Sequence, residues 1–147
     1  MTAQIKASGV EARRLTFEIT ETTAMTDLSM TARLLKKLQD LGCKTALDDF
    51  GAGYSSYAYL KNLPVNYVKI DGSFITGLEH SSLNREIVKS MHTIAKIMGK
   101  QTIAEFVESE QAAQILTAMG VDYLQGYYIG KPEITDLDPD SGSGLPE

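Results

Sequence analysis

The chain has 147 residues and a formal net charge of −5, with 43% hydrophobic and 22% charged residues. This length suits one domain with a real core, and no run approaches the roughly 18 apolar residues of a membrane span. The negative charge argues mildly against a general nucleic-acid binder, so we expect no DNA partner. The first residues lack the apolar core of a signal peptide. The only cysteine, Cys43, fits a reducing compartment, and we expect a cytoplasmic protein.

Strand-length apolar runs alternate with amphipathic helical patterns from the N-terminus onward. A predicted strand, Leu15–Thr20, and a second, Thr45–Phe50, enclose a helix with an apolar face of Leu28, Leu35, Leu38 and Leu41. A third predicted strand, Tyr67–Asp71, precedes a helix whose face is formed by Leu83, Ile87, Met91, Ile94 and Met98. The last elements are a strand at Thr102–Val107, a helix with Ile115, Leu116 and Met119, and a strand at Tyr123–Tyr128.

Capping residues mark both ends of the predicted helices. The N-cap candidates are Thr26 or Asp27, Ser81 or Ser82, and Ser109. Glycines directly follow the last apolar residue of each helix, at the position where a left-handed backbone suits glycine: Gly42, Gly99 and Gly120. Polar residues recur five or six positions after these glycines, at similar heights on the following strands: Asp48, Glu105 and Gln125.

This order of elements predicts the fold class. Strands that are apolar on both faces and joined by helices are typical of a parallel α/β sheet. In (β/α) barrels the active site lies at the C-terminal rim of the strands, and a complete barrel has eight strands in about 250 residues. We therefore expect a partial TIM-barrel-like fold over residues 1–132, with about five barrel strands and the early ones missing. Residues 133–147 are predicted to form a flexible acidic tail.

Asp48 and Asp49 are the candidate centre of the chemistry. Two adjacent carboxylates repel each other unless a cation is present, and the glycine-containing loop Phe50–Ser56 can bring backbone amides to phosphate oxygens. With Glu18 and Glu105, the pair predicts an acidic cluster that binds a divalent metal and hydrolyses a phosphodiester. The alternative is a pair of acids that caps a helix or faces water.

Lys69 and the small number of histidine and cysteine residues indicate which kind of charged site to expect. Lys69 lies between Val68 and Ile70 on an otherwise buried strand, so it needs a carboxylate or phosphate partner unless it reaches solvent. The two histidines, His80 and His92, lie far from any ligand motif, which makes a zinc site improbable. We expect a hard cation with oxygen ligands, Mg²⁺ or Mn²⁺.

The polar motifs occur together in an order that resembles one family. They are Glu-Ile-Thr-Glu at residues 18–21, Leu-Asp-Asp-Phe-Gly-Ala-Gly-Tyr-Ser-Ser at 47–56, Val-Lys-Ile-Asp-Gly-Ser-Phe at 68–74, Ile-Ala-Glu-Phe-Val-Glu at 103–108, and Leu-Gln-Gly-Tyr-Tyr-Ile-Gly-Lys-Pro at 124–132. From about Ile5 to Pro132 the chain closely resembles the C-terminal part of the EAL domain, the bacterial cyclic di-GMP phosphodiesterase family. Members are modified TIM barrels that use Mg²⁺ or Mn²⁺ to hydrolyse cyclic di-GMP to the linear dinucleotide.

The resemblance implies a role for each polar residue. It makes Glu18, Asp48 and Asp49 metal-binding carboxylates. It makes Lys69 and Glu105 catalytic, together with Asp49. Gln125, Glu21 and Glu108 become substrate-binding or supporting residues, and Glu21 is expected to steady the loop after the aspartate pair.

The resemblance also reveals departures from the family. The Glu-Ala-Leu segment and a metal-binding asparagine, which lie on earlier strands, are absent; Ala52 and Phe106 replace a common threonine and a common glycine. We therefore expect the parent protein to be an enzyme and this chain alone to be inactive or weak. We favour a C-terminal fragment; the alternatives are a degenerate module and a shortened domain that pairs as a homodimer or self-completing oligomer. A further alternative is a non-catalytic module that senses cyclic di-GMP or docks a partner.

Overall fold

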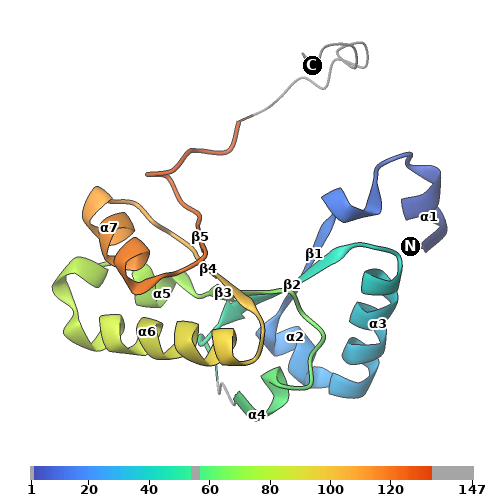
Figure 1. The fold of residues 1–147 in the computed structure, drawn as a ribbon, viewed down its shortest axis with the longest axis horizontal. Coiled ribbons are helices and arrows are strands. Elements are labelled where there is room, and N and C mark those ends of the chain that lie inside the picture. The colour runs from blue at the N-terminus through green and yellow to red at the C-terminus, as the bar shows by residue number, and fades with distance from the viewer. Residues whose placement is uncertain (1, 54–56, 134–147) are drawn as a thin grey trace.

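A parallel five-stranded sheet forms the centre of the computed structural model, which describes residues 2–53 and 57–133 (Figure 1). The strands lie in chain order and are listed with their bounds: β1 (Thr16–Thr20), β2 (Lys44–Phe50), β3 (Tyr67–Ile70), β4 (Gln101–Ala104) and β5 (Tyr123–Leu124). Every neighbouring pair is parallel. The predicted parallel α/β architecture with about five strands is confirmed.

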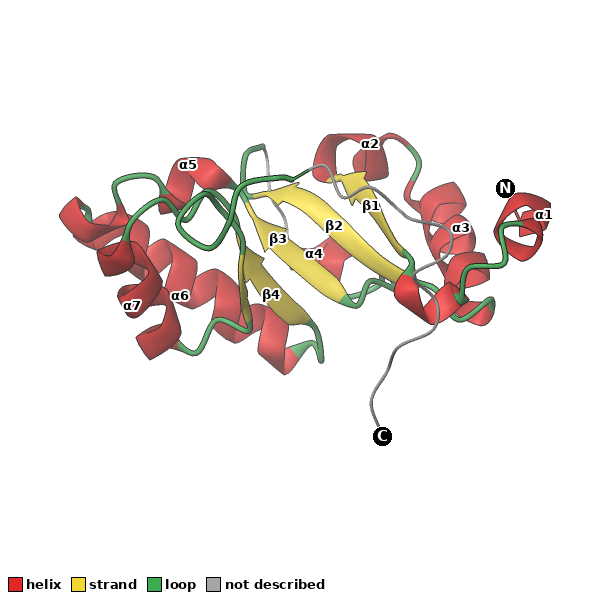
Figure 2. Ribbon diagram, turned by 90° about the horizontal axis from the view of Figure 1, so that it is seen from above, coloured by secondary structure: helices red, strands yellow, loops and turns green. Residues whose placement is uncertain are grey.

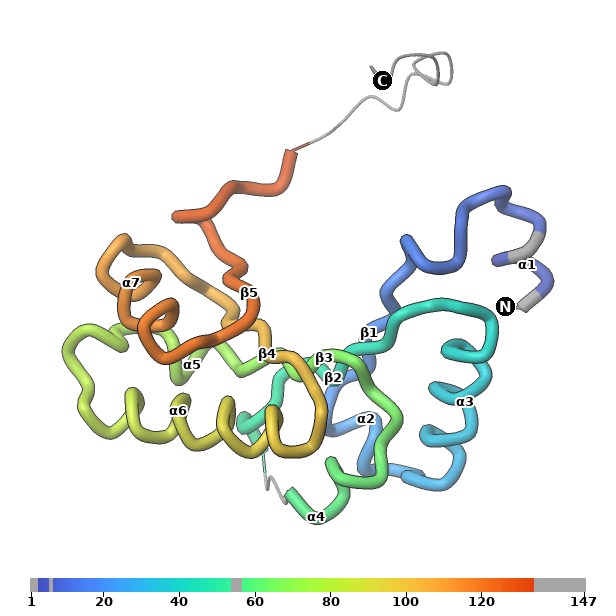
Figure 3. Tube along the Cα trace, in the orientation of Figure 1, coloured from blue at the N-terminus to red at the C-terminus, as the bar shows by residue number. Residues whose placement is uncertain are grey.

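Helices connect the strands, as parallel pairing requires. The α-helices are α1 (Thr2–Ala7), α2 (Glu21–Thr26), α3 (Leu28–Asp40), α4 (Tyr57–Leu60), α5 (Gly72–Ile75), α6 (Ser82–Ile97) and α7 (Glu110–Met119), and the short 3-10 helices are η1 (Ala12–Arg14) and η2 (Leu78–His80). The trace shows α3 at the β1 end of the sheet and α6 and α7 beside β4 and β5 at the other end (Figure 3). Within the described residues, no helix combines the length and the apolar character that crossing a bilayer requires.

The helix boundaries follow the predicted caps. The side chains of Asp27, Ser81 and Ser109 accept hydrogen bonds from backbone amides in the first turns of α3, α6 and α7. Of the two pairs of alternatives, Asp27 and Ser81 are therefore the N-caps. The glycines after these helices all adopt the left-handed conformation, with φ of 93° at Gly42, 73° at Gly99 and 87° at Gly120.

Two predicted strands end earlier than expected. The fourth stops at Ala104 rather than Val107, because Phe106 has a φ of 55° and turns the backbone out of the extended conformation. The fifth stops at Leu124 rather than Tyr128. Beyond both strands the two segments remain joined by hydrogen bonds from Val107 N to Gln125 O and from Tyr128 N to Val107 O. The residues predicted as strand ends thus form the loops at the rim.

The apolar face predicted for α6 is partly wrong. Leu83 is 68% exposed, whereas Val88, Met91 and Ala95 are buried. At about 100° per residue, the buried stripe points roughly a third of a turn away from Leu83. Val88 and Ala95, rather than Leu83, therefore lie on the buried side of α6.

Helices pack on one face of the sheet, whereas the other face is open (Figure 2). Leu47, Val68 and Ala104 face the helices and belong to the main hydrophobic core. The opposite face carries residues that line an open pocket of about 440 Å³, among them Glu18, Tyr67, Ile103 and Tyr123. In a closed barrel this face points to the interior, so the sheet corresponds to part of a barrel wall. Residues 134–147 of the predicted tail 133–147, and loop residues 54–56, lie outside the described part.

Candidate metal centre

The acidic side chains predicted at the rim lie at the carboxyl ends of neighbouring strands. Thr20 of β1 pairs with Asp48 of β2, and Ile70 of β3 pairs with Ala104 of β4. Glu105 follows Ala104 directly, and its amide donates to Ile70 O. This register places Glu18, Asp48, Lys69 and Glu105 on one face of the sheet, because paired residues of a parallel sheet point the same way.

Lys69 lies at the centre of the charged residues. Its Nζ is 2.9 Å from Glu18 Oε2, 3.2 Å from Asp48 Oδ1 and 2.9 Å from Glu105 Oε1. The residue is only 4% exposed, so the ammonium is held by carboxylates and does not reach solvent. Burial alone lowers the pKa of Lys69, but the hydrogen bonds to Glu18 and Glu105 and the charge of Asp48 raise it above its ordinary value. Lys69 therefore stays charged.

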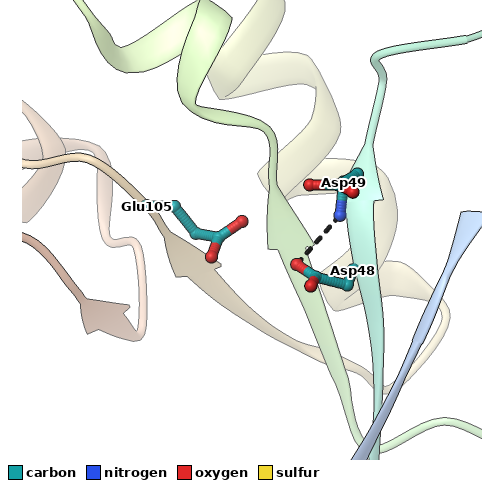
Figure 4. A group of neighbouring side chains, drawn as sticks. All are labelled: Asp48, Asp49 and Glu105. Carbon is teal, nitrogen blue, oxygen red and sulfur yellow. Dashed lines mark hydrogen bonds between the residues drawn. The ribbon is translucent and has the colours of Figure 1, made fainter.

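Three carboxylates form a group suited to a cation. Among the described residues, Asp48, Asp49 and Glu105 each offer one oxygen, and these oxygens lie within 4.8 Å of one another (Figure 4). Glu18 is not in this group; its carboxylate is bonded to Lys69 instead. An all-oxygen donor set suits a hard divalent cation.

Burial and neighbouring negative charge raise the pKa values of two of these carboxyl groups, Asp49 and Glu105. Burial raises the pKa of Asp49, and the charges of Asp48 and Asp71 raise it further. Burial also raises the pKa of Glu105, against the opposing effect of Lys69 and with the help of Asp48. A divalent cation would relieve this repulsion.

The backbone at Asp49 explains how both aspartates reach the same rim. Successive residues of a regular strand point to opposite faces. The pairing of β2 with β3 shifts register between Leu47 and Phe50, and Asp49 has a φ of 55°, in the left-handed region. Asp49 N also donates to Asp48 Oδ1 at 3.0 Å. Aspartate tolerates this conformation better than most residues, so the irregularity turns its carboxylate toward its neighbour.

Glu21 supports the backbone that follows this pair. It begins α2, is 4% exposed, and its Oε2 accepts a hydrogen bond of 3.1 Å from Gly51 N. Its Oε1 accepts from the hydroxyl of Tyr59, in α4. Tyr59 was missed by sequence reasoning. The available signal was weak: a buried tyrosine needs a partner for its hydroxyl, but only the structure shows that it is buried.

Gln125 and Glu108 lie beside the acidic group. With Glu105, Phe106 and Tyr127 they line a pocket of about 330 Å³. Gln125 is positioned by its amide, which donates to Ala104 O at 2.8 Å. The structure thus brings Gln125 and Glu108 to a pocket next to Glu105, outside the three-carboxylate group.

The chain is similar to known proteins across most of its length. The EAL domain family matches residues 1–132. Cyclic di-GMP phosphodiesterase PdeF of Escherichia coli (strain K12) is 45% identical over 124 residues, which are 84% of this chain and 17% of PdeF.

Solved structures show the same fold. A MucR phosphodiesterase in complex with c-di-GMP is 38% identical with a TM-score of 0.81, over 88% of this chain and 52% of that chain. BlrP1 of Klebsiella pneumoniae, in a complex with manganese and cyclic di-GMP, is 29% identical with a TM-score of 0.78, over 86% of this chain and 32% of that chain.

The chain therefore spans less than a fifth of PdeF and about half of the MucR chain. Its five parallel strands correspond to a partial TIM-barrel-like fold, as predicted. The family match covers nearly all of the described residues and every motif of the candidate metal centre. The chain belongs to the EAL domain family.

Proposed function

We propose that this domain forms part of a divalent-metal site that hydrolyses one phosphodiester bond of cyclic di-GMP, giving the linear dinucleotide. The observation that carries the proposal is the grouping of Asp48, Asp49 and Glu105 oxygens within 4.8 Å of one another, with Lys69 beside them. The names of PdeF and MucR as phosphodiesterases support it.

The donor set favours Mg²⁺ or Mn²⁺ as the cation. Carboxylate oxygens are the ligands that such hard ions prefer. The related BlrP1 has been solved with manganese and with calcium, each together with cyclic di-GMP. Asp48 and Asp49 would hold the cation in this proposal, with Glu18 of β1 as a further carboxylate ligand.

Each residue of the centre has a chemical task in the proposed reaction. A divalent cation supplies positive charge to the phosphate and makes water more acidic. Glu105 accepts a proton from the attacking water, and its raised pKa makes it a better base than an ordinary glutamate. Lys69 places a fixed positive charge beside the phosphate and holds Glu105 in position. Gln125 and Glu108 contact the nucleotide from the adjoining pocket.

We further propose that this chain alone is inactive or weak. It contains no Glu-Ala-Leu sequence, so the glutamate of that segment is not among its metal ligands. The face of the sheet that carries Glu18 and Tyr123 is open to solvent, and an open sheet favours association. A homodimer or self-completing oligomer would cover this face, and light scattering at several protein concentrations tests that.

Calorimetry and chromatography together test the proposed function. Mn²⁺ is titrated into the chain, and cyclic di-GMP is then added and its products are separated. We expect Mn²⁺ binding that falls at least tenfold in Asp48→Asn, and nucleotide binding that depends on Mn²⁺. Asp27→Asn is the matched control, because asparagine also caps α3.

Two results would contradict the proposal. Equal Mn²⁺ affinity in Asp48→Asn and the unaltered chain would place the cation elsewhere. Tight nucleotide binding without metal, and without any product, would favour the sensing module. Rapid hydrolysis by the chain alone would support the metal site and overturn only the expectation of weak turnover.

A further inference from the structure

Tyr59 and Glu21 form a buried contact between two segments that are 38 residues apart. Tyr59 lies in α4 and is 7% exposed, and its hydroxyl donates to Glu21 Oε1 at the start of α2. Burial raises the pKa of Tyr59, and the hydrogen bond to Glu21 raises it further. The hydroxyl therefore keeps its proton and remains a donor.

The other oxygen of the Glu21 carboxylate holds the backbone beside the metal centre. Oε2 accepts from Gly51 N, two residues after Asp49. Gly51 has a φ of 100°, and a Cβ there would lie 2.5 Å from Met91 Cε and 2.8 Å from Phe74 Cε2. The backbone at Gly51 is thus confined by side chains on one side and by Glu21 on another.

A carboxylate that is held through both oxygens has a fixed plane, and each donor that is removed leaves it freer to rotate about its last torsion. Removing the Tyr59 hydroxyl would take away one donor to Glu21 Oε1 and weaken the hold of this carboxylate on Gly51. The hold on Gly51 lies two residues after Asp49, whose left-handed backbone is uncommon for a residue other than glycine and is kept by its surroundings.

We propose that Tyr59 is a positioning residue of the metal centre, which acts through Glu21 and Gly51 to keep the Asp49 carboxylate beside Asp48 and Glu105. This role rests on the proposed function and extends it to a residue that contacts neither cation nor substrate. The alternative is that Tyr59 serves the hydrophobic core alone, since its ring belongs to the main core. Phenylalanine at this position keeps the ring and removes only the hydroxyl.

Tyr57→Phe is the matched control. Tyr57 belongs to the same short helix, and its ring packs near Phe50 with 5.8 Å between centroids. Its hydroxyl forms no hydrogen bond with any residue in the described part of the chain. The two substitutions remove the same atom from the same helix, and only one of them touches Glu21.

The experiment measures Mn²⁺ affinity by calorimetry and Gly51 amide exchange by NMR, in the complete chain. We expect Tyr59→Phe to weaken Mn²⁺ binding about fivefold to tenfold and to speed Gly51 exchange by a similar factor. Tyr57→Phe should change neither. In a Glu21→Gln background, Tyr59→Phe should have little further effect, because both substitutions break the same connection.

Unchanged Gly51 exchange in Tyr59→Phe would overturn the proposal, and so would effects of Tyr59→Phe and Glu21→Gln that simply add. A core-only role predicts lower global stability with equal Mn²⁺ affinity in the folded protein. If the unaltered chain does not bind Mn²⁺, the proposed function is wrong. Gly51 exchange still decides whether Tyr59 holds the backbone through Glu21.

Discussion

Replacing Lys69 by methionine removes a buried charge and keeps a side chain of similar length. The ammonium has three carboxylate oxygens at 2.9, 3.2 and 2.9 Å. At an effective dielectric constant of about 20, one such contact is worth roughly 5 kcal/mol before desolvation is subtracted. The side chain of Glu18 is 45% exposed, so solvent screens its share of the attraction. Breaking a buried charged cluster typically costs about 3–5 kcal/mol, and we expect that loss for Lys69→Met without metal.

Mn²⁺ should restore much of the lost stability. Without Lys69, the carboxylates of Asp48 and Glu105 face each other with no positive charge, and a divalent cation supplies it. Saturating Mn²⁺ should therefore stabilise Lys69→Met more than the unaltered chain. Chemical unfolding followed by circular dichroism, with EDTA and with Mn²⁺, measures both differences.

Lys100→Met is the matched control. Lys100 is also buried, but its Nζ donates to the carbonyl oxygens of Leu63 and Val65 rather than to carboxylates. Its replacement should cost stability that Mn²⁺ does not restore. Two results would refute the reasoning. One is that Lys69→Met is as stable as the unaltered chain in EDTA, and the other is that Mn²⁺ restores the stability of both variants equally.

Three further substitutions test the fold. Gly126→Ala should destabilise by about 1–3 kcal/mol in urea, because a Cβ would lie 2.3 Å from Val107 N and O; an unchanged midpoint would be inconsistent with this close approach. Burial holds the pKa of His92 below its ordinary value, so its contribution to stability is complete above about pH 6.5 and is lost as the pH falls. His92→Gln should flatten the stability profile between pH 7.5 and 5.5, by at most about 1.4 kcal/mol per pH unit. Ser81→Ala should cost about 1 kcal/mol of helix capping in thermal melts, and Ser82→Ala should cost less.

The helix ends show how far local sequence reasoning reaches. Gly42, Gly99 and Gly120 were placed correctly because a left-handed helix end depends on the residue itself. Asp27 and Ser81 became the caps over Thr26 and Ser82, a choice that depends on the first turn of each helix. The exposed Leu83 shows the limit, because periodicity alone does not determine which side of a helix meets the sheet.

The meeting of Asp48, Lys69 and Glu105 at one rim was predictable from the sequence, whereas the contacts among their side chains were not. The alternation of strands and helices predicted that Asp48, Lys69 and Glu105 meet at one rim, since the carboxyl ends of parallel strands share an edge. The roles of Glu18, Glu21, Gln125 and Glu108 came from motif resemblance and remain proposals.

The sequence by itself determined that the sheet is parallel, where the glycines end the helices, and at which rim the acids gather. Each of these follows from local patterns and from the helices that connect the strands. Only the tertiary structure decided that Lys69 bonds to Glu18, 51 residues away, that Asp49 turns out of the regular strand, and that Tyr59 holds Glu21. These contacts join segments that are far apart in the chain, so no local sequence pattern predicts them. A left-handed aspartate likewise depends on the groups that surround it.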